Sequence, residues 1–438
     1  MVIESYCKGL ISKKQLLIIK ANNFSADKTL VRGEKVMIIG SLDLSLLLFR
    51  KELMESWIQA GFQVVAVARG EKVKKQLKEM GVGYYNIPIE RTGLNPVRDL
   101  FIIYKIWRLI SIEKPDYILL YTIKPVIYGS LAAMFFKKTK VFSMITGLGY
   151  VFMEESYSGR IANFDEGVRS TTNLSMNCKN PPIRKLSLHL LKHTVVSLYR
   201  LALKRNEKVL FQNPDDIDIF IHLKIVRLER VVEINGSGVN LEHFKQYPSG
   251  ASEEDIKAIT FLSIARLIEE KGIREYVAAA RTIKRKYPQT KFILVGWSFE
   301  DNPSAISAKQ LEEWRDEGVV NIFGETQDVR PYLASSSVYV LSSYREGTPR
   351  TVLEAMAMGR PIITSDVPGC RETVINGVNG FLVEARNIVD LANAMEKFIN
   401  NPELIKNMGK ASRQIAEEKY NVHKVNQVIN KAMGLDIV

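Results

Sequence analysis

The sequence contains few cysteines and no long apolar run. Its 438 residues include three cysteines, Cys7, Cys178 and Cys370, which lie far apart without metal-ligand spacing. Neither a disulfide scaffold nor a structural zinc site is therefore expected. No segment reaches the roughly 18–20 apolar residues that a membrane-spanning helix needs, and the N-terminus shows no secretory cleavage pattern. These absences are typical of a protein that works in a reducing, cytoplasmic compartment.

Signals for other chemistries are absent or weak as well. The five histidines are scattered and form no metal or triad pattern. No G-x-G-x-x-G follows the first expected strand, which disfavours a dinucleotide dehydrogenase. Asp216-Ile-Asp218 has the form of a D-x-D motif, which binds a metal and a diphosphate in one class of glycosyltransferase. It follows Asn213-Pro214, however, where acids at a helix start interact with the helix dipole. We therefore expect no metal site.

Positive charge is concentrated in the first half of the chain. The net charge is +13, with 61 Lys and Arg against 48 Asp and Glu. Residues 1–210 hold 33 of these bases and 17 of the acids, a net of +16, and the remaining 28 bases and 31 acids give −3. This asymmetry indicates a polyanionic partner: nucleic acid, an anionic membrane or a phosphorylated substrate. Scattered lysines that only aid solubility are the alternative. Nucleic acid is disfavoured, because no nucleic-acid-reading motif accompanies the charge.

Apolar periodicity predicts an α/β protein of two doubly wound domains. From Glu34, strand-like runs alternate with helical ones. Strands are expected at 35–40, 62–68, 84–89, 116–121, 140–146 and 208–213, and helices at 44–61, 71–80, 95–112, 126–136 and 187–205. Such alternation is typical of parallel βαβ units. The polar, aperiodic segment 153–186 interrupts it and is interpreted as an insertion.

The same alternation starts again near Val232. Strands are expected at 259–266, 291–296, 319–324, 338–343 and 360–365, and the stretch 403–433 is helical. We predict an N-terminal extension at 1–33, a first Rossmann-like domain at 34–230 and a second at 231–415. A C-terminal helix at 416–438 would return toward the first domain, and 231–244 would form the hinge. Two such sheets bind ligands in a crevice at their strand ends.

The second domain carries the most specific constellation. Arg266 ends a strand and is followed by Lys271-Gly272, which opens a helix. An arginine, a lysine and a helix N-terminus together suit a diphosphate. Glu346 and Glu354 stand eight apart in SYREGTPRTVLEAMAMG, and Gly347-Thr348-Pro349 between them permits close backbone approach before a helix near Arg350. Alone, each element is compatible with a solvated surface; together they indicate a nucleotide-sugar site.

These motifs resemble the retaining GT-B glycosyltransferases of glycosyltransferase family 4, over roughly residues 35–435. The resemblance lies in SIARLIEEKG (263–272), VGWSFEDNPSAIS (295–307), NIFGETQDVRPYL (321–333), the run 343–374 and NGVNGFLV (376–383). The segments NPSAIS and VPGCRE are similar to a bacterial subgroup that adds HexNAc-type sugars to polyprenyl-diphosphate-linked saccharides. Such enzymes build O-antigen, capsule and N-glycan precursors.

The resemblance implies roles for single residues in the donor site. Arg266 and Lys271 would hold the donor diphosphate, assisted by Gly272, and the backbone at Phe323-Gly324 would meet the base. Glu354 would bind ribose, and Glu346 would contact the donor sugar beside Gly347, Thr348 and Pro349. The donor would be a nucleotide sugar, UDP-linked by expectation, and no cofactor or metal is expected.

The first domain matches the same subgroup in RTGLNPVRDL (91–100), TIKPVIYGSLAA (122–133) and ITGLGYVF (145–152). Acceptor binding is therefore expected from Arg50, Lys124, Thr146 and Gly147, with Lys124 near the acceptor diphosphate. Alternatively, the Pro and Gly residues of these segments only shape turns. The Gly-Ser-Leu-Asp loop at 40–43 departs from the usual glycine pair of the family.

Helix 95–110 combines aromatic and basic residues. It fits either a membrane interface or a core-facing helix. Taken together, the sequence predicts a retaining, metal-independent transferase at the inner face of the plasma membrane, in contact with its anionic surface. A sugar-nucleotide 2-epimerase and a non-catalytic nucleotide-sugar-binding subunit are the alternatives. The epimerase would need acids and a histidine around the sugar, and no such cluster is evident.

Overall fold

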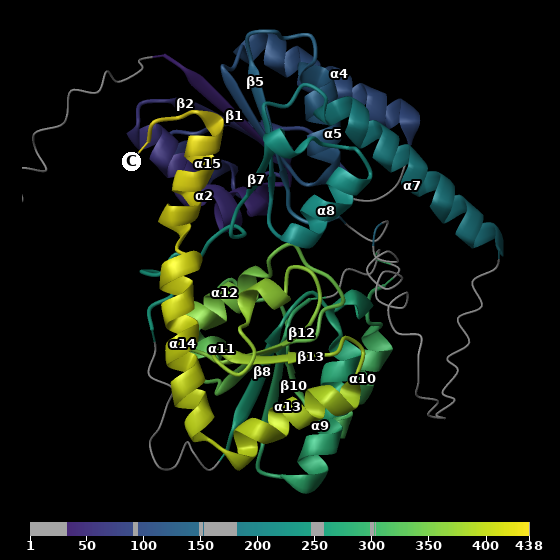
Figure 1. The fold of residues 1–438 in the computed structure, drawn as a ribbon, viewed down its shortest axis with the longest axis vertical. Coiled ribbons are helices and arrows are strands. Elements are labelled where there is room, and N and C mark those ends of the chain that lie inside the picture. The colour runs from purple at the N-terminus through teal and green to yellow at the C-terminus, as the bar shows by residue number, and fades with distance from the viewer. Residues whose placement is uncertain are drawn as a thin grey trace, which may run out of the picture.

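Two parallel sheets form the framework of the protein. A computed structural model describes residues 33–90, 95–148, 152, 182–246, 258–297, 302 and 304–437. The seven strands of the first sheet have the order β3-β2-β1-β4-β5-β6-β7, and the six strands of the second have the order β10-β9-β8-β11-β12-β13. Neighbouring strands in both sheets pair in parallel. The predicted pair of doubly wound α/β domains is therefore confirmed (Figure 1).

The first domain is built from seven strands with helices between them. Its strands are β1 (Lys35–Leu42), β2 (Gln63–Arg69), β3 (Gly83–Asn86), β4 (Tyr117–Tyr121), β5 (Lys140–Ile145), β6 (Lys208–Phe211) and β7 (Val231–Glu233). Its helices are α2 (Asp43–Gln59), α3 (Lys74–Glu79), α4 (Pro96–Glu113), α5 (Ile123–Ala133), α7 (Pro182–Leu203), α8 (Pro214–His222) and the 3-10 turn η2 (Leu228–Arg230). The inner strands β2, β1, β4, β5 and β6 carry buried side chains on both faces, as parallel sheets covered on both sides require.

The second domain repeats the plan. Its strands are β8 (Thr260–Ile264), β9 (Lys291–Val295), β10 (Asn321–Phe323), β11 (Val338–Leu341), β12 (Ile362–Ser365) and β13 (Gly380–Val383). The following helices are η4 (Glu269–Lys271), α9 (Ile273–Lys286), α10 (Ala308–Glu317), α11 (Arg330–Ala334), α12 (Arg350–Ala357), η5 (Arg371–Thr373), α13 (Ile388–Asn400), α14 (Glu403–Lys419) and α15 (Val422–Met433).

Three expectations on boundaries need correction. The first domain was expected to end at residue 230, but β7 pairs with β6, Val209 opposite Val231, and so extends the first sheet through Glu233. Helix α7 begins at Pro182 inside the expected insertion, because proline is well suited to the first helical turn. The strand β13, with the sequence GFLV, was not expected. Residues 1–32 and 153–181 lie outside the described residues.

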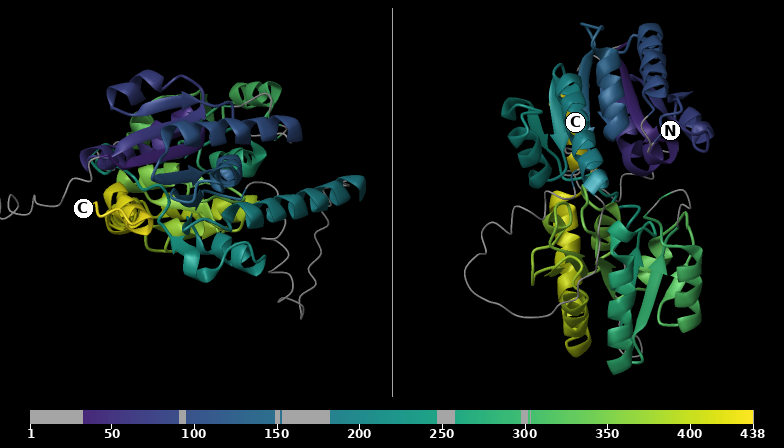
Figure 2. Two further views of the ribbon diagram at one scale, coloured as in Figure 1. Left: turned by 90° about the horizontal axis from the view of Figure 1, so that it is seen from above. Right: turned by 90° about the vertical axis from the view of Figure 1, so that its right-hand side faces the viewer.

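The C-terminal helices connect the two domains. Helices α14 and α15 run along one side of the molecule, and their break at Tyr420 and Asn421 lies between the domains (Figures 1 and 2). Helix α15 packs on α2, and Trp57 Nε1 donates a hydrogen bond to Asn430 Oδ1 at 2.9 Å. The end of the chain therefore becomes part of the first domain's core.

The carboxyl ends of both sets of strands face each other. Thr146 follows β5 and Gln212 follows β6, and both lie against Gly347, which follows β11: a Cβ on Gly347 would come within 2.4 Å of the Thr146 carbonyl oxygen. Gly236, which follows β7, lies against Thr348 in the same way. Ligands of open α/β sheets bind at this end of the strands, where the strand order reverses. The fold therefore places the loops at this end of one sheet against those of the other.

Candidate active site

The reversal point of the second sheet lies between β8 and β11, and it holds the predicted donor residues. Arg266 follows β8 and Glu346 follows β11, on neighbouring strands of the sheet. Hydrogen bonds join the segments that follow these two strands. Tyr344 N donates to Glu270 O at 2.9 Å, and Ser342 Oγ donates to Gly272 O at 2.8 Å. Residues 75 positions apart in sequence therefore form one site.

Lys271 and Glu346 contact each other directly. The Lys271 ammonium forms an ion pair with the Glu346 carboxylate, and both side chains are largely buried, with 16% and 13% of their surface exposed. Ser343 Oγ donates a second hydrogen bond to Glu346 Oε1 at 2.7 Å. Arg266, five residues before Lys271, is half-buried. Its side chain has no hydrogen bond or ion pair with any described residue. Lys271 and Ser343 thus both contact the Glu346 carboxylate.

Glu354 is held on the first turns of α12. This helix begins at Arg350, as predicted, with Pro349 as its N-cap. Arg350 Nε donates to Glu354 Oε1 at 2.8 Å, one turn away. Burial raises the pKa of Glu354 above its ordinary value, and the adjacent Arg350 opposes this increase. The arginine therefore keeps a buried carboxylate available as a hydrogen-bond acceptor.

Two of the glycines predicted in the donor site are also required by the fold itself. Gly272 has φ +65°, a left-handed conformation at the N-cap of α9, and a Cβ there would lie 2.0 Å from the Ser342 carbonyl oxygen. Gly347 is required by the first domain, because its Cβ would also come within 2.6 Å of Gln212 Oε1. Glycine was expected at Gly347 for close approach to a ligand; the close approach that the structure shows is between domains.

An exposed aromatic ring marks another edge of the site. Phe323 ends β10 and is 42% exposed, with its ring 5.2 Å from that of Tyr332. Gly324 follows it, with open space where a side chain would be. The backbone here is accessible, and Phe323 offers a face on which a planar base can stack.

The β6–α8 turn of the first domain binds the donor loop, which sequence reasoning missed. Asn213 Nδ2 donates to Gly347 O at 3.0 Å, and Thr348 Oγ1 donates to Gln212 O at 3.0 Å. Arg345 forms a buried ion pair with Asp216. The residues on both sides of Glu346 in the sequence, Arg345 and Gly347-Thr348, are thus in contact with the first domain.

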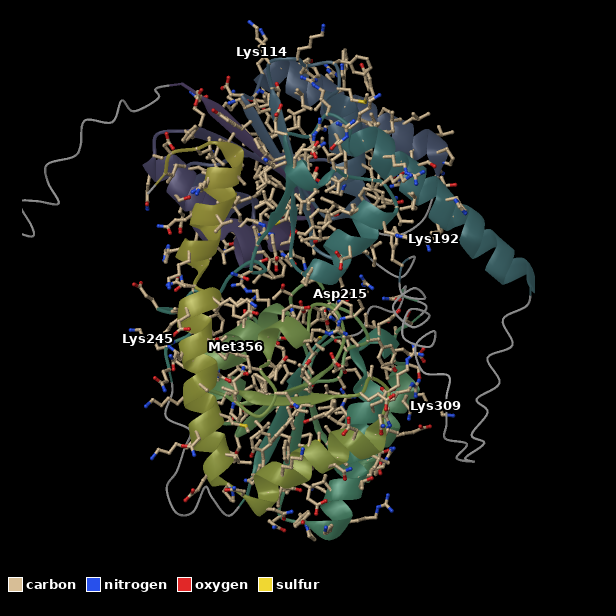
Figure 3. All side chains as sticks on the ribbon, viewed as in Figure 1. Lys114, Lys192, Asp215, Lys245, Lys309 and Met356 are labelled. Carbon is tan, nitrogen blue, oxygen red and sulfur yellow. The ribbon has the colours of Figure 1, made fainter. Side chains whose placement is uncertain are left out.

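Acidic residues of this turn do not form a metal-binding pair. Asp216 is fully buried against Arg345, and Asp215, seen between the domains in Figure 3, accepts from Arg371 NH1 at 3.2 Å. Asn213 also caps α8, because Asp216 N donates to its Oδ1 at 2.8 Å. Among the described residues, no three His, Cys, Asp or Glu side chains gather as metal ligands. The sequence around Asn213-Pro214 was interpreted as a helix start, and α8 begins there.

The reversal point of the first sheet lies between β1 and β4, next to Lys124. Ser41 Oγ and Thr122 Oγ1 form a hydrogen bond across these strand ends. Thr122 has φ +68° and ψ 155°, a sparsely populated conformation that proteins retain mainly at functional sites. Lys124 lies on the first turn of α5 and pairs with Asp99 of α4 at 3.4 Å. This is the position at which a sheet of this order binds a ligand.

Arg50 is buried in the core of the first domain. It belongs to the buried stripe of α2 with Leu46, Leu53 and Trp57 and is 1% exposed. Its NH2 group contacts Met144 Sδ at 2.7 Å, and its guanidinium lies 5.3 Å from the Tyr121 ring centroid. Burial lowers its pKa to about 10. The helical period turns this side chain toward the core, which corrects the expectation that Arg50 contacts the acceptor.

Thr146 and Gly147 lie where the two domains meet. Gly147 has φ +132°, and a Cβ there would be 3.7 Å from Gly347 N. The loop expected to bind an acceptor is thus in contact with the loop expected to bind the donor sugar. Gly149, the last residue of the predicted Thr-Gly-Leu-Gly loop, lies outside the described residues.

The two facing Rossmann-like domains have the GT-B architecture. Solved structures agree on the fold. HepE of Anabaena in complex with UDP superposes with a TM-score of 0.67 at 18% identity, over 92% of this chain and 99% of that one. A sucrose-phosphate synthase from Thermosynechococcus elongatus gives a TM-score of 0.69 at 18% identity, over 91% and 98% of the two chains.

Sequence comparison defines the second domain more narrowly. Residues 249–415 match the family model "Glycosyl transferases group 1", so this domain is a group 1 glycosyltransferase domain. The chain is 24% identical over 379 residues to N,N'-diacetylbacillosaminyl-diphospho-undecaprenol alpha-1,3-N-acetylgalactosaminyltransferase of Campylobacter jejuni, covering 84% of this chain and 90% of that protein. It is also 30% identical over 158 residues to the capsular polysaccharide biosynthesis glycosyltransferase CapM of Staphylococcus aureus, covering 36% and 41%. These findings confirm the predicted resemblance.

Proposed function

We propose that the protein transfers a HexNAc or related sugar, with retention of configuration, from a UDP-sugar to a polyprenyl-diphosphate-linked saccharide of a bacterial surface polysaccharide or glycan. The observation that carries the proposal is the contact between Lys271 and Glu346. In a nucleotide sugar, the sugar is bonded directly to the terminal phosphate. A cation for that phosphate and a carboxylate for the sugar hydroxyls must therefore be neighbours, as they are here.

The nature of the substrates is proposed from the relatives. HepE was solved with UDP, and the Campylobacter jejuni relative is named for an undecaprenol-diphosphate-linked acceptor and for N-acetylgalactosamine. The exposed ring of Phe323 suits a planar base, and Glu354 suits the hydroxyls of ribose. The donor-site assignments of Arg266, Gly272, Gly324, Thr348 and Pro349 belong to this proposal.

The reaction needs stabilisation of the charge that develops on the leaving diphosphate. The acceptor hydroxyl oxygen bonds to C1 of the donor sugar as the bond from C1 to the phosphate oxygen breaks. The acceptor proton passes to the leaving phosphate oxygen on the same face, so no side-chain base is required. Arg266, Lys271 and the N-terminus of α12 supply positive charge, and we propose that neither a metal nor a cofactor takes part.

Lys124 and the Thr146-Gly147 loop are proposed to bind the acceptor. Lys124 lies at the reversal point of the first sheet, where a diphosphate would find its ammonium and the start of α5. Thr146 and Gly147 contact the donor loop at Gly347, where the acceptor hydroxyl has to meet the donor sugar. The burial of Arg50 leaves it out of this arrangement.

A lipid-linked acceptor implies work at a membrane. No helix of the described residues is long and apolar enough to cross a bilayer. We propose peripheral attachment of the basic first half to the anionic inner face of the plasma membrane. Added salt should release the protein from anionic vesicles, because screening shortens the reach of surface charge. Attachment that ignores salt would contradict this electrostatic contact.

The test of the site is substitution with a matched control. We expect Lys271→Ala to lose transfer by about 100-fold or more, the effect of removing one group that stabilises developing charge. Glu354→Ala should also lose transfer, because the ribose hydroxyls lose their hydrogen-bond acceptor. Lys286→Ala is the control, since Lys286 forms a comparable ion pair with Glu396 on the surface of the same domain. Near-wild-type transfer by the first two variants would overturn the donor site.

Product analysis tests the reaction itself. A panel of UDP-sugars and polyprenyl-diphosphate saccharides, analysed by mass spectrometry, identifies both substrates, and NMR of the new anomeric centre reports retention or inversion. Donor turnover should require acceptor. Turnover to an epimerised nucleotide sugar, or donor binding without any turnover, would instead indicate the epimerase or the non-catalytic subunit.

A further inference from the structure

Helix α4 has a buried apolar face and an exposed apolar face. Ile102, Ile106, Leu109 and Ile110 are buried in the core, as a helix covering a sheet requires. The opposite side exposes large apolar side chains together with Phe135 just after α5: Val97, Leu100, Phe101, Tyr104, Trp107 and Ile112 are 38–79% exposed. The core-facing prediction for this helix is thus confirmed for one face, and the membrane interface stays a prediction for the other. Apolar patches of this kind mark binding sites.

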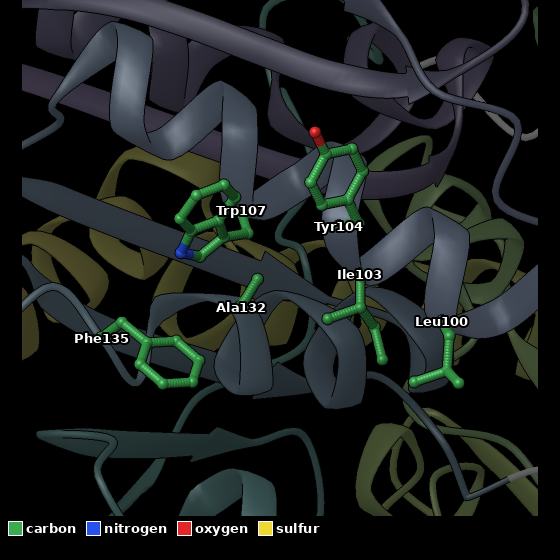
Figure 4. Close-up of a pocket in the computed structure, with 6 residues that line it drawn as sticks. All are labelled: Leu100, Ile103, Tyr104, Trp107, Ala132 and Phe135. Atoms are coloured by element: carbon green, nitrogen blue, oxygen red, sulfur yellow. The ribbon is translucent and has the colours of Figure 1, made fainter.

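The exposed face borders a groove. The groove has a volume of about 470 Å³ and lies between α4 and α5 (Figure 4). Its lining is apolar apart from the tips of two aromatic rings: Leu100, Ile103, Tyr104, Trp107, Ala132 and Phe135. Tyr104 and Trp107 stack on each other with ring centroids 5.9 Å apart, which gives one wall a continuous aromatic surface.

The groove leads away from the proposed acceptor site. Lys124 at the start of α5 pairs with Asp99 at the start of α4, and Phe136 beyond the end of α5 contacts Trp107 of α4, with 6.4 Å between ring centroids. The two helices therefore run side by side in the same direction. From Lys124 to Phe135 the distance along a helix is about 17 Å at 1.5 Å per residue.

We propose that this groove binds the isoprenoid chain of the acceptor. The inference rests on the proposed function, because it takes a polyprenyl diphosphate as the substrate. With the diphosphate at Lys124 and the saccharide directed to the junction with the second domain, the chain has to leave on the other side, along α4 and α5. An extended hydrocarbon chain can lie along an apolar groove and gains free energy with each carbon that it buries.

Water-soluble acceptors with prenyl chains of increasing length test this without a membrane. For the wild type we expect kcat/KM to rise by about tenfold or more from the shortest chain to one that fills the groove, and then to level off, since buried apolar area sets the gain. The variant Leu100→Ser/Phe135→Ser should bring long-chain acceptors down toward the rate of the shortest one. Both side chains are exposed, so the fold should tolerate the changes.

The control is Ile375→Ser/Val389→Ser, which removes two exposed apolar side chains from the second domain. It should keep the full chain-length dependence. Equal rates for all chain lengths in the wild type, or an unchanged dependence in the groove variant, would overturn the groove assignment while leaving the transferase proposal intact. Loss of vesicle binding alone, with chain-length dependence retained, would identify the surface as a membrane contact instead. Donor turnover without transfer to any prenyl acceptor would overturn the proposed acceptor class itself.

Discussion

The buried ion pair between Asp216 and Arg345 joins the two domains at the donor loop. Asp216 is 0% exposed on α8 of the first domain, and the Arg345 side chain is 5% exposed on the loop after β11 of the second. Burial raises the pKa of Asp216, and the arginine opposes that increase. The pair lies next to Glu346, so its loss should change the position of the residue proposed to hold the donor sugar.

We predict that Asp216→Asn weakens the contact between the domains and leaves each domain folded. Removing one member of a buried pair costs about 3–5 kcal/mol, because the remaining buried charge loses the opposite charge that compensates for its burial. Since every 1.4 kcal/mol is about tenfold in an equilibrium, the closed arrangement should lose a factor of about 100 or more. Separation of the domains lets water reach Arg345, so this cost favours opening over unfolding. The hydrogen bond from Asn213 to the same loop should be lost with it.

Three measurements test this reasoning. Small-angle scattering should show a larger radius of gyration for Asp216→Asn, turnover should fall, and thermal unfolding of the separate domains should change little. Asp216→Leu/Arg345→Met should recover compactness in part, because replacing both charges by apolar groups is often close to neutral. Glu317→Gln is the control, since it breaks the partly exposed pair with Arg281 within one domain. Wild-type compactness and turnover in Asp216→Asn would refute the argument.

Three further predictions concern single contacts. In Gly347→Ala the new Cβ would lie 2.4 Å from the Thr146 carbonyl oxygen, so the clash should separate the domains and lower turnover while the protein stays folded. A scattering profile as compact as wild type would contradict this. Asn430→Ala should lower the free energy of unfolding by about 1–3 kcal/mol, because Trp57 Nε1 loses its buried acceptor, and denaturant titration measures the change. Cys370 should resist alkylation at pH 8 until the protein unfolds, since it is 0% exposed and burial raises the pKa of its thiol; peptide mapping of native protein that shows the adduct would disprove this.

Much of the fold was predictable because parallel strands and their helices carry strong local patterns. KVMIIG and DYILLY are continuous apolar runs, and β1 and β4 formed where they were expected. The strand β7 was not predictable in this way. Three residues, Val231–Glu233, have no period of their own, and only pairing with β6 makes them a strand of the first sheet.

Some residues of the candidate site could be predicted from local sequence, and others could not. Lys271, Glu346 and Glu354 were found from local sequence, because a glycine turn and a helix start surround them. Arg50 was misplaced, since a basic residue on a mixed helix gives no local sign of which face is buried. Its burial follows from the packing of α2 against β4 and β5.

The sequence by itself determined the class of fold, the donor motifs and the excess of positive charge in the first half. These depend on local period, on turn residues and on composition, which the chain carries without folding. Only the tertiary structure decided that Lys271 contacts Glu346, that Asp216 serves an interdomain ion pair, and that α4 leaves one apolar face exposed beside α5. Each of these joins elements distant in the chain, and their proximity is set by strand order and helix packing. No local pattern encodes it.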